Sequence, residues 1–269
     1  EIKSFNSEST YKVDAEFITK NGGNLKAKLD KTFNTKENAQ NFLKKNISSS
    51  YSVESLEKKP LKKSSSAPFT TSTLQQEASR KLYFSVSKTM TVAQRLYESG
   101  LITYMRTDSV NLSNSAKDSA KDHIVKNYGN EYSSSKSYKT KSKGAQDAHE
   151  AIRPTNFSMT GDNIADNDQK RLYQLIWKRT IASQMTDASL EKTNVKIKSS
   201  NHEVLFASTG QIVKFDGFLK VYSEAKGDGV EEDNSMLPKI DLNEDLKLTN
   251  IKANQRFSRP PYRYTEASL

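Results

Sequence analysis

The sequence predicts an α+β fold with more than one domain, in which a mainly α-helical domain is inserted into a β-rich domain. Three observations predict it. Apolar residues alternate near the start of the chain, recur at helical spacing through its middle, and alternate again towards its end. We place the split β-rich domain at residues 1–65 and 189–269, and the inserted helical domain at 66–188. A length of 269 residues accommodates two modest domains.

The first segment predicts a hairpin followed by a helix. Residues 11–17 and 25–29 alternate between apolar and polar, and Asn21-Gly22-Gly23 between them supplies residues suited to positive φ in a tight turn. Asn34 or Thr35 can cap the helix that follows. A further strand is predicted at 51–56.

Residues 58–68 are rich in Lys, Ser and Pro, and mark the first crossing between the predicted domains. They fit a solvated linker or a phosphate-contacting stretch. Ser and Pro dominate the end of the stretch, which favours the linker.

Four helices are predicted in the inserted domain, and capping residues and glycines mark their ends. The signals are a Ser72/Gln75 capping box, stops at Gly100 and Gly129, a start at Ser113 or Ser115, and a last helix over about 168–185. On that last helix, Trp177 is assigned to the core, and Arg171, Lys178 and Arg179 to a solvated face. Residues 130–144 lack periodicity and predict a surface loop.

Beyond the last helix the pattern returns to strands. Short alternating runs predict strands at 195–197, 204–206, 212–215, 218–222 and 246–251. Gly227-Asp228-Gly229 opens an acidic loop that runs to Asp233.

The most informative stretch is Gly-Leu-Ile-Thr-Tyr-Met-Arg-Thr-Asp-Ser at 100–109. We predict a short strand here, and alternation places Tyr104, Arg106 and Asp108 on one face. Two interpretations are open. Tyr104 can lie at the rim of a core beside an Arg–Asp pair, or it can be a nucleophile with an electrostatic helper. A phenol titrates near roughly pH 10 and needs a nearby cation to react at neutral pH.

Three segments of the sequence, taken in this order, resemble those of a known protein family. They are Ala-Pro-Phe-Thr-Thr-Ser-Thr-Leu-Gln-Gln at 67–76, running on to Thr-Val-Ala-Gln-Arg-Leu-Tyr at 91–97; the stretch at 100–109 with Val-Asn-Leu-Ser after it; and His-Glu-Ala-Ile-Arg-Pro-Thr at 149–155. Together they resemble the active-site region of the type IA DNA topoisomerases, the class of bacterial DNA topoisomerase I. Pro-Pro-Tyr-Arg-Tyr-Thr-Glu-Ala-Ser-Leu at 260–269 resembles the same family.

The resemblance implies that Tyr104 attacks a DNA phosphodiester, forming a 5′-phosphotyrosyl link and a free 3′-hydroxyl. Because the link keeps the bond energy, strand passage and religation would relax negatively supercoiled DNA, opened as a single-stranded segment, without ATP. Arg106 would hold non-bridging phosphate oxygens.

Four further residues are implied with supporting roles. His149 matches the active-site histidine of the family and would contact a phosphate, and Gln94 matches a residue near the site. Asp108 would orient Arg106 or a neighbour, with a turn or cap role as the alternative. Arg153 is a second cation that can equally anchor the short helical turn predicted at 149–155, with Glu150 as its partner.

The resemblance also implies Mg²⁺, bound by an acidic cluster in a separate N-terminal domain. We find no such cluster in this sequence, because Asp166-Asn167-Asp168 lies at a helix start where capping explains it. The family's zinc ribbons are missing too, consistent with the absence of Cys. We therefore expect a central fragment, the arch of the enzyme with its nucleophile, whose partners are DNA and the remaining domains of the same chain. Alone it should not relax DNA.

Net charge and composition narrow the possible partners and location of the protein. A net charge of +10 favours a polyanionic partner, and a chain without Cys forms no disulfide or thiolate zinc site. No apolar run could span a bilayer and no signal peptide is visible, so we expect a bacterial cytoplasmic, nucleoid-associated protein without membrane contact.

Three alternative interpretations compete with this resemblance. Tyrosine recombinases and type IB enzymes place His-x-x-Arg before the tyrosine, whereas here Tyr104 precedes His149. A non-enzymatic basic module would explain the charge and the scattered Tyr and Lys residues. A purely structural piece would leave the three strings unexplained.

Overall fold

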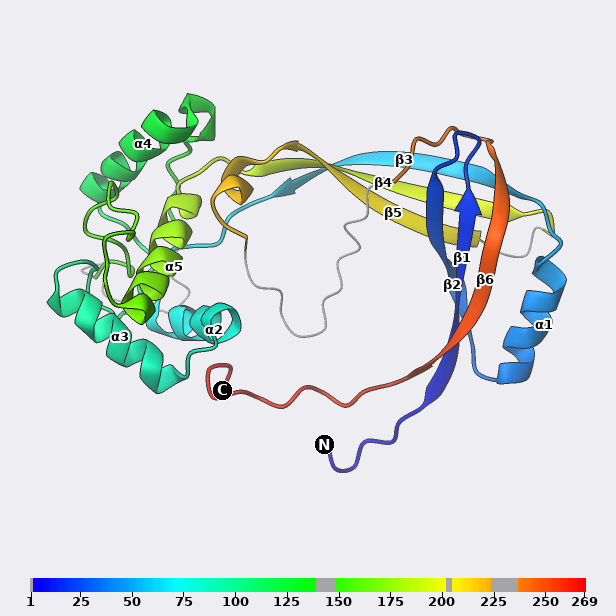
Figure 1. Ribbon diagram of the computed structural model, residues 1–269, viewed down its shortest axis with the longest axis horizontal. Helices are drawn as coiled ribbons and strands as arrows, with labels where there is room; N and C mark the ends of the chain where they lie inside the picture. Colours follow the sequence, from blue (N-terminus) through cyan, green and yellow to red (C-terminus); the bar gives the residue numbers. More distant parts are fainter. Residues whose placement is uncertain (1, 139–148, 202–204, 224–236) are drawn as a thin grey trace. The chain divides into compact units, whose positions relative to one another are not determined.

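The computed structural model describes residues 2–138, 149–201, 205–223 and 237–269 (Figure 1). Within these ranges the chain forms five α-helices and six strands, which confirms the α+β class. It divides into two compact units. The first comprises Glu1–Leu61, Leu190–Lys214 and Glu231–Tyr262, and the second Lys62–Ser189, Phe215–Val230 and Arg263–Leu269. The predicted division differs from this one at 62–65, 189, 215–230 and 263–269, all of which it assigned to the β-rich domain.

The strands form a closed sheet in the order β1-β2-β5-β4-β3-β6. Their bounds are β1 Ser9–Ile18, β2 Asn24–Phe33, β3 Tyr51–Lys63, β4 Ala188–Ser199, β5 Leu205–Phe215 and β6 Asp245–Phe257. β1 pairs antiparallel with both β2 and β6, and Figure 1 shows the three side by side. The predicted hairpin is confirmed: Gly22, at φ 79°, turns β1 into β2.

The core of the first unit is built on aromatic rings from three strands. Phe17 lies edge-on to Tyr51, with ring centroids 5.0 Å apart, and to Phe206, at 5.9 Å. Burial raises the pKa of Tyr51 to about 12, and its hydroxyl donates to the Asn46 carbonyl. Helix α1, Lys36–Asn46, ends at that residue, and Thr35 is its cap.

The second unit holds the other four α-helices. Their bounds are α2 Thr71–Leu82, α3 Val86–Glu98, α4 Asn114–Tyr128 and α5 Asn167–Ser183, with short 3₁₀ turns η1 Asn130–Tyr132 and η2 Gly217–Lys220. Ser113 caps α4, which confirms that start, and Asp166 caps α5. The capping box of α2 is Thr70 with Thr73 instead of the predicted Ser72 with Gln75, so this helix begins two residues earlier.

Two predicted elements outside the stretches at 100–109 and 149–155 are wrong. Residues 58–63 are the second half of β3 and not a linker, because a strand exposed on both faces carries no apolar alternation. Residues 217–220 form η2, where a strand was expected, since Phe218 and Tyr222 are buried four residues apart at helical spacing. The acidic loop at 227–233, Val204 and residues 139–144 of the predicted surface loop lie outside the described residues.

The predicted faces of α5 are partly confirmed. Trp177 is in the core, 6% exposed, and its indole N–H donates to the Phe157 carbonyl at 2.9 Å. Arg179, however, is buried. Its Nε donates to the Ala67 carbonyl at 2.7 Å and its guanidinium lies 4.8 Å from the centre of the Phe69 ring. The backbone carbonyl and the ring replace the water that the charge was expected to need.

Candidate active site

The stretch at 100–109 is extended but is not a strand. Its one bridge pairs Ile102 with Pro154, so no regular ladder forms. The predicted alternation is nevertheless present. Tyr104, Arg106 and Asp108 are exposed while Met105 and Ser109 are buried. The side chains alternate because the segment is held straight by isolated backbone contacts on each side.

The stretch at 149–155 supplies part of those contacts, and it is extended too, not the predicted helical turn. Ile152 N donates to the Phe69 carbonyl at 2.8 Å, and Thr155 N donates to the Leu101 carbonyl at 3.0 Å. Thr103 N completes the arrangement by donating to the Arg153 carbonyl at 2.9 Å. The three strings at 67–76, 100–109 and 149–155 are thus brought together through their backbones.

Tyr104 is accessible. Its side chain is 48% exposed, and its hydroxyl has no hydrogen-bond partner in the part of the chain that the structure describes. One edge of the ring packs against Tyr97 of α3, with centroids 5.2 Å apart and planes at 64°. This packing orients the phenol and leaves its oxygen free to approach a substrate.

Arg106, Asp108 and His149 line one open hollow of about 360 Å³, together with Thr71, Ser72 and Thr107. Within the described ranges Arg106 forms no ion pair, so Asp108 lies beside it in the hollow without neutralising it. A guanidinium fork and an imidazole that face the same space can donate to the oxygens of one phosphate group. Tyr104 precedes Arg106 by two residues and is not part of the lining.

Arg153 is used internally. Its Nη2 and Nε donate to Glu150 Oε2 at 2.6 and 3.1 Å, and its Nη1 donates to the Pro154 carbonyl at 3.0 Å. Glu150 Oε1 accepts from the backbone N–H of Ser113 at 2.6 Å, at the start of α4. Burial raises the pKa of the Glu150 carboxyl, but the hydrogen bonds from Arg153 and Ser113 outweigh it and leave the pKa below its usual range.

Gln94 lies on α3, where its amide donates to Glu98 at 2.6 Å. Its predicted place beside the reacting groups stays a prediction. Sequence reasoning assigned no role in the site to two other residues, Tyr97 and Thr71. No local signal separates Tyr97 from an ordinary residue of a helix face. Thr71 stands in the first string, but a threonine beside a helix cap has an ordinary local explanation.

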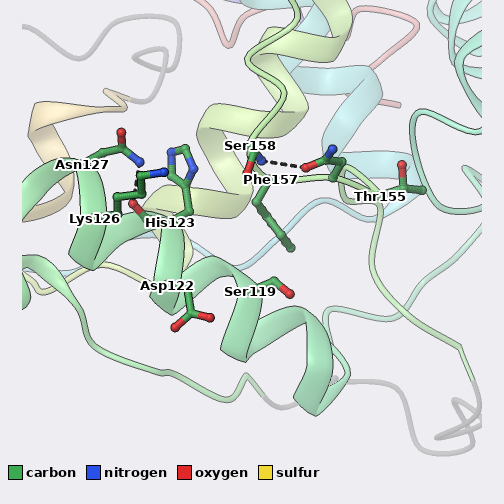
Figure 2. A pocket seen from close by; sticks show the side chains of 9 residues that line it. Ser119, Asp122, His123, Lys126, Asn127, Thr155, Phe157 and Ser158 are labelled. Atoms are coloured by element: carbon green, nitrogen blue, oxygen red, sulfur yellow. Dashed lines mark hydrogen bonds between the residues drawn. The ribbon is translucent and has the colours of Figure 1, made fainter.

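Two other polar clusters in the second unit are structural. A hollow of about 450 Å³ lies between α4 and residues 155–158. Figure 2 shows the side chains that line it. There, burial and the nearby Lys126 lower the pKa of His123, whose ring lies edge-on to Trp177 at 5.3 Å. Burial and the contact with Trp177 give His123 a structural role.

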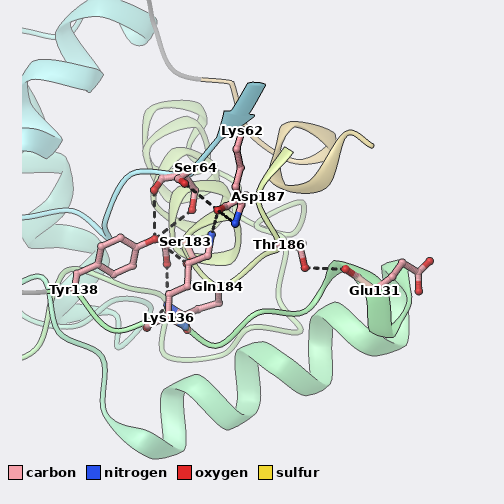
Figure 3. Close-up of polar contacts among 10 residues, drawn as sticks. Lys62, Ser64, Glu131, Lys136, Tyr138, Ser183, Gln184, Thr186 and Asp187 are labelled. Carbon is pink, nitrogen blue, oxygen red and sulfur yellow. Dashed lines mark hydrogen bonds and ion pairs between the residues drawn. The ribbon is translucent and has the colours of Figure 1, made fainter. Parts of the chain in front are cut away.

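In the second cluster Asp187 accepts from Lys136 and from Ser64, and pairs with Lys62 (Figure 3). Burial raises the pKa of Asp187, and the bonds from Lys136 and Ser64 lower it further than burial raises it. The cluster ties the end of β3 to the start of β4.

The described residues hold no group of three or more His, Asp or Glu side chains that could bind a metal ion. Nor does any helix in these ranges combine the length and apolarity needed to cross a membrane.

Comparison with known proteins identifies the class. A family model described as DNA topoisomerase matches residues 1–269, so the chain belongs to the DNA topoisomerase family. The chain is 43% identical to DNA topoisomerase 1 of Rickettsia bellii, covering 100% of this chain and 36% of that protein. It is 40% identical to DNA topoisomerase 1 of Campylobacter jejuni, covering 96% of this chain and 37% of that one.

A solved structure agrees. Full-length topoisomerase I from Thermotoga maritima matches with a TM-score of 0.81 and 34% identity, over 99% of this chain and 44% of that chain. The resemblance to bacterial DNA topoisomerase I is thereby confirmed. The chain spans between 36% and 38% of the length of the Rickettsia relatives it matches.

Proposed function

We propose that this chain carries the DNA-cleaving tyrosine of a type IA DNA topoisomerase. The observations that support it are the backbone pairing of the three strings, the hollow that Arg106 and His149 line together, and the exposure of Tyr104 two residues before Arg106. Membership of the DNA topoisomerase family supplies the substrate, DNA.

In the proposed reaction the Tyr104 oxygen attacks a phosphorus atom of the DNA backbone. A bond forms between that oxygen and phosphorus, the bond from phosphorus to the 3′ oxygen breaks, and the 3′ oxygen leaves as a hydroxyl. The phenol loses one proton and the leaving oxygen gains one, so the exchange is neutral overall. Religation is the same exchange in reverse, and ATP is not consumed.

Arg106 and His149 act on the phosphate during this exchange. Negative charge builds on the non-bridging oxygens in the transition state, and donors already fixed beside them stabilise it without reorganising. The guanidinium is suited to this role because it presents a planar fork of donors and is unpaired in the described part of the chain. Arg153, bound to Glu150, supports the site from within.

The remaining elements of the proposal come from the family. The substrate is a single-stranded segment of negatively supercoiled duplex, and the chain works with further domains of a longer bacterial protein in the cytoplasm, at the nucleoid. A requirement for Mg²⁺, with ligands outside the described residues, belongs to the same proposal. The chain alone is proposed not to relax DNA, and relaxation of a supercoiled plasmid by residues 1–269 with Mg²⁺ would contradict this.

A mixing experiment tests the chemistry. The chain is combined with a separately produced metal-binding portion and a single-stranded oligonucleotide labelled at its 5′ or its 3′ end, and covalent adducts are counted after denaturation. We expect an adduct through the 5′-phosphate that is lost in Tyr104→Phe and weakened about 10²-fold or more in Arg106→Ala. An adduct through the 3′-phosphate would assign the chain to the recombinase type of chemistry. Salt-sensitive binding without any adduct would leave only a DNA-binding module.

A further inference from the structure

We propose that Thr71 is the positioning residue for Arg106, and that its hydroxyl fixes the backbone from which the guanidinium reaches the phosphate. This inference rests on the proposed function, because it assigns Thr71 a task in the same site. Thr71 is the first residue of α2 and lines the hollow together with Arg106 and His149.

The hydroxyl of Thr71 contacts the backbone on both sides of Arg106. The Thr71 hydroxyl donates to two carbonyl oxygens, that of Met105 at 2.8 Å and that of Thr107 at 3.1 Å. Thr71 Oγ1 also accepts from the backbone N–H of Thr107 at 2.9 Å. The Met105 carbonyl belongs to the peptide group before Arg106, and the Thr107 N–H to the peptide group after it. One hydroxyl therefore restrains both peptide groups that flank the Arg106 Cα atom.

Thr71 is itself rigidly held. Its own N–H donates to the Thr107 carbonyl at 2.9 Å. Thr70 before it is the cap of α2, and the buried Leu74 fixes the first turn of the helix in the core. Two residues before Thr71, Phe69 accepts the backbone bond from Ile152. The Thr71 hydroxyl thus connects the exposed segment around Arg106 to the start of α2. The residues just before α2 are in turn bonded to the stretch at 149–155, which contains His149.

Helix formation does not explain this hydroxyl. The capping role is already filled by Thr70 with Thr73, and threonine is a poor helix former. The segment that carries Arg106, by contrast, has no strand ladder to straighten it and depends on isolated contacts. A restraint at Arg106 matters for catalysis, because a misplacement of about 1 Å at a phosphate contact can cost about 10²-fold in rate.

Three variants separate this role from general stability. Thr71→Val keeps the shape of the side chain and removes the hydroxyl, whereas Thr71→Ser keeps the hydroxyl. Thr73→Val is the matched control, because it removes a hydroxyl from the capping box of the same helix without touching the Arg106 segment. Thermal unfolding of each variant confirms that it is folded before any other measurement.

The first readout needs no DNA. Amide hydrogen exchange of Thr107 should become about tenfold faster in Thr71→Val, since its acceptor is gone, and stay within about twofold of wild type in Thr71→Ser and Thr73→Val. The second readout is the NMR signal of the Arg106 Nε–H on titration with a single-stranded pentathymidine. Wild type and Thr71→Ser should show a saturable shift, and Thr71→Val should need about tenfold more oligonucleotide.

Each outcome decides between the two proposals. If the wild-type signals of Arg106 and His149 do not respond to the oligonucleotide, the proposed function fails and the role of Thr71 fails with it. If wild type responds and Thr71→Val responds equally, only the role of Thr71 is overturned. The same holds if Thr107 exchange is unchanged in Thr71→Val, or if Thr73→Val has as large an effect as Thr71→Val.

Discussion

In the variant Glu150→Gln a neutral amide replaces a carboxylate that accepts hydrogen bonds from two residues, Ser113 and Arg153. In the native chain one oxygen accepts from Ser113 N and the other from Nη2 and Nε of Arg153. A glutamine side chain has a single acceptor oxygen. Its amide NH₂ group must therefore face either the Ser113 N–H or the guanidinium, and one of these donors loses its acceptor.

The cost follows from the bonds that are lost. The Arg153 and Glu150 side chains are 16% and 28% exposed, so water compensates only part of the loss. A hydrogen bond to a charged group contributes about 1.5–3 kcal/mol, and we expect Glu150→Gln to lower the free energy of unfolding by about 2 kcal/mol at pH 7. The control is Lys170→Gln, which breaks a more exposed pair with Asp162 and should cost below about 1 kcal/mol.

The effect should depend on pH in one direction. The pKa of Glu150 is lowered in the folded chain, so its ionised form stabilises the fold above the unfolded pKa of about 4.3. That contribution is lost as the pH falls through the folded pKa, where a protonated Glu150 resembles glutamine. The difference between wild type and Glu150→Gln should therefore be full near pH 7 and shrink below about pH 4.

Urea unfolding followed by tryptophan fluorescence measures this difference. The chain has a single tryptophan, Trp177, which is buried in the second unit, so the signal reports the unit that contains Glu150. A wild-type minus Glu150→Gln difference that is the same at pH 7 and pH 3.5 would refute the argument. It would mean that the ionised pair with Arg153 contributes nothing to folding.

Two further predictions concern backbone conformation. Tyr83 ends α2 at φ 59° with its side chain 87% exposed, so Tyr83→Gly should raise the free energy of unfolding by about 0.5–1 kcal/mol by removing left-handed strain without losing packing. Tyr83→Ala keeps that strain, and equal stabilisation by Ala in the same urea titration would contradict the reasoning. Gly217 has φ 50°, and a Cβ atom there would lie 2.4 Å from the Thr186 carbonyl oxygen. Gly217→Ala should therefore cost about 2–4 kcal/mol in the same assay, and a loss below about 1 kcal/mol would show that the backbone yields at little cost.

Local signals in the sequence were sufficient for several elements. The Asn21-Gly22-Gly23 turn, the start of α4 at Ser113 and its stop at Gly129 appear as predicted, because each depends on residues close together in the chain. The same holds for the exposed face of Tyr104, Arg106 and Asp108, since alternation follows from an extended backbone whether or not a ladder forms. The order of the three strings was also enough to indicate the family.

Other features depend on partners distant in the chain, and here the predictions were wrong or silent. The stretch at 149–155 is extended because Phe69 and Leu101 bond its backbone, and nothing within the seven residues encodes those partners. Arg179 is buried because a carbonyl and an aromatic ring from before α2 receive it.

The sequence by itself determined the class of fold, the family, and which side chains face outward beside Tyr104. Only the tertiary structure decided that Arg106 and His149 line one hollow, that Arg153 is bound to Glu150, and that Thr71 restrains the backbone around Arg106. The physical reason is the range of the interactions. Periodicity and capping act over a few residues, whereas these bonds join segments that are separated in the chain and meet only in the folded unit.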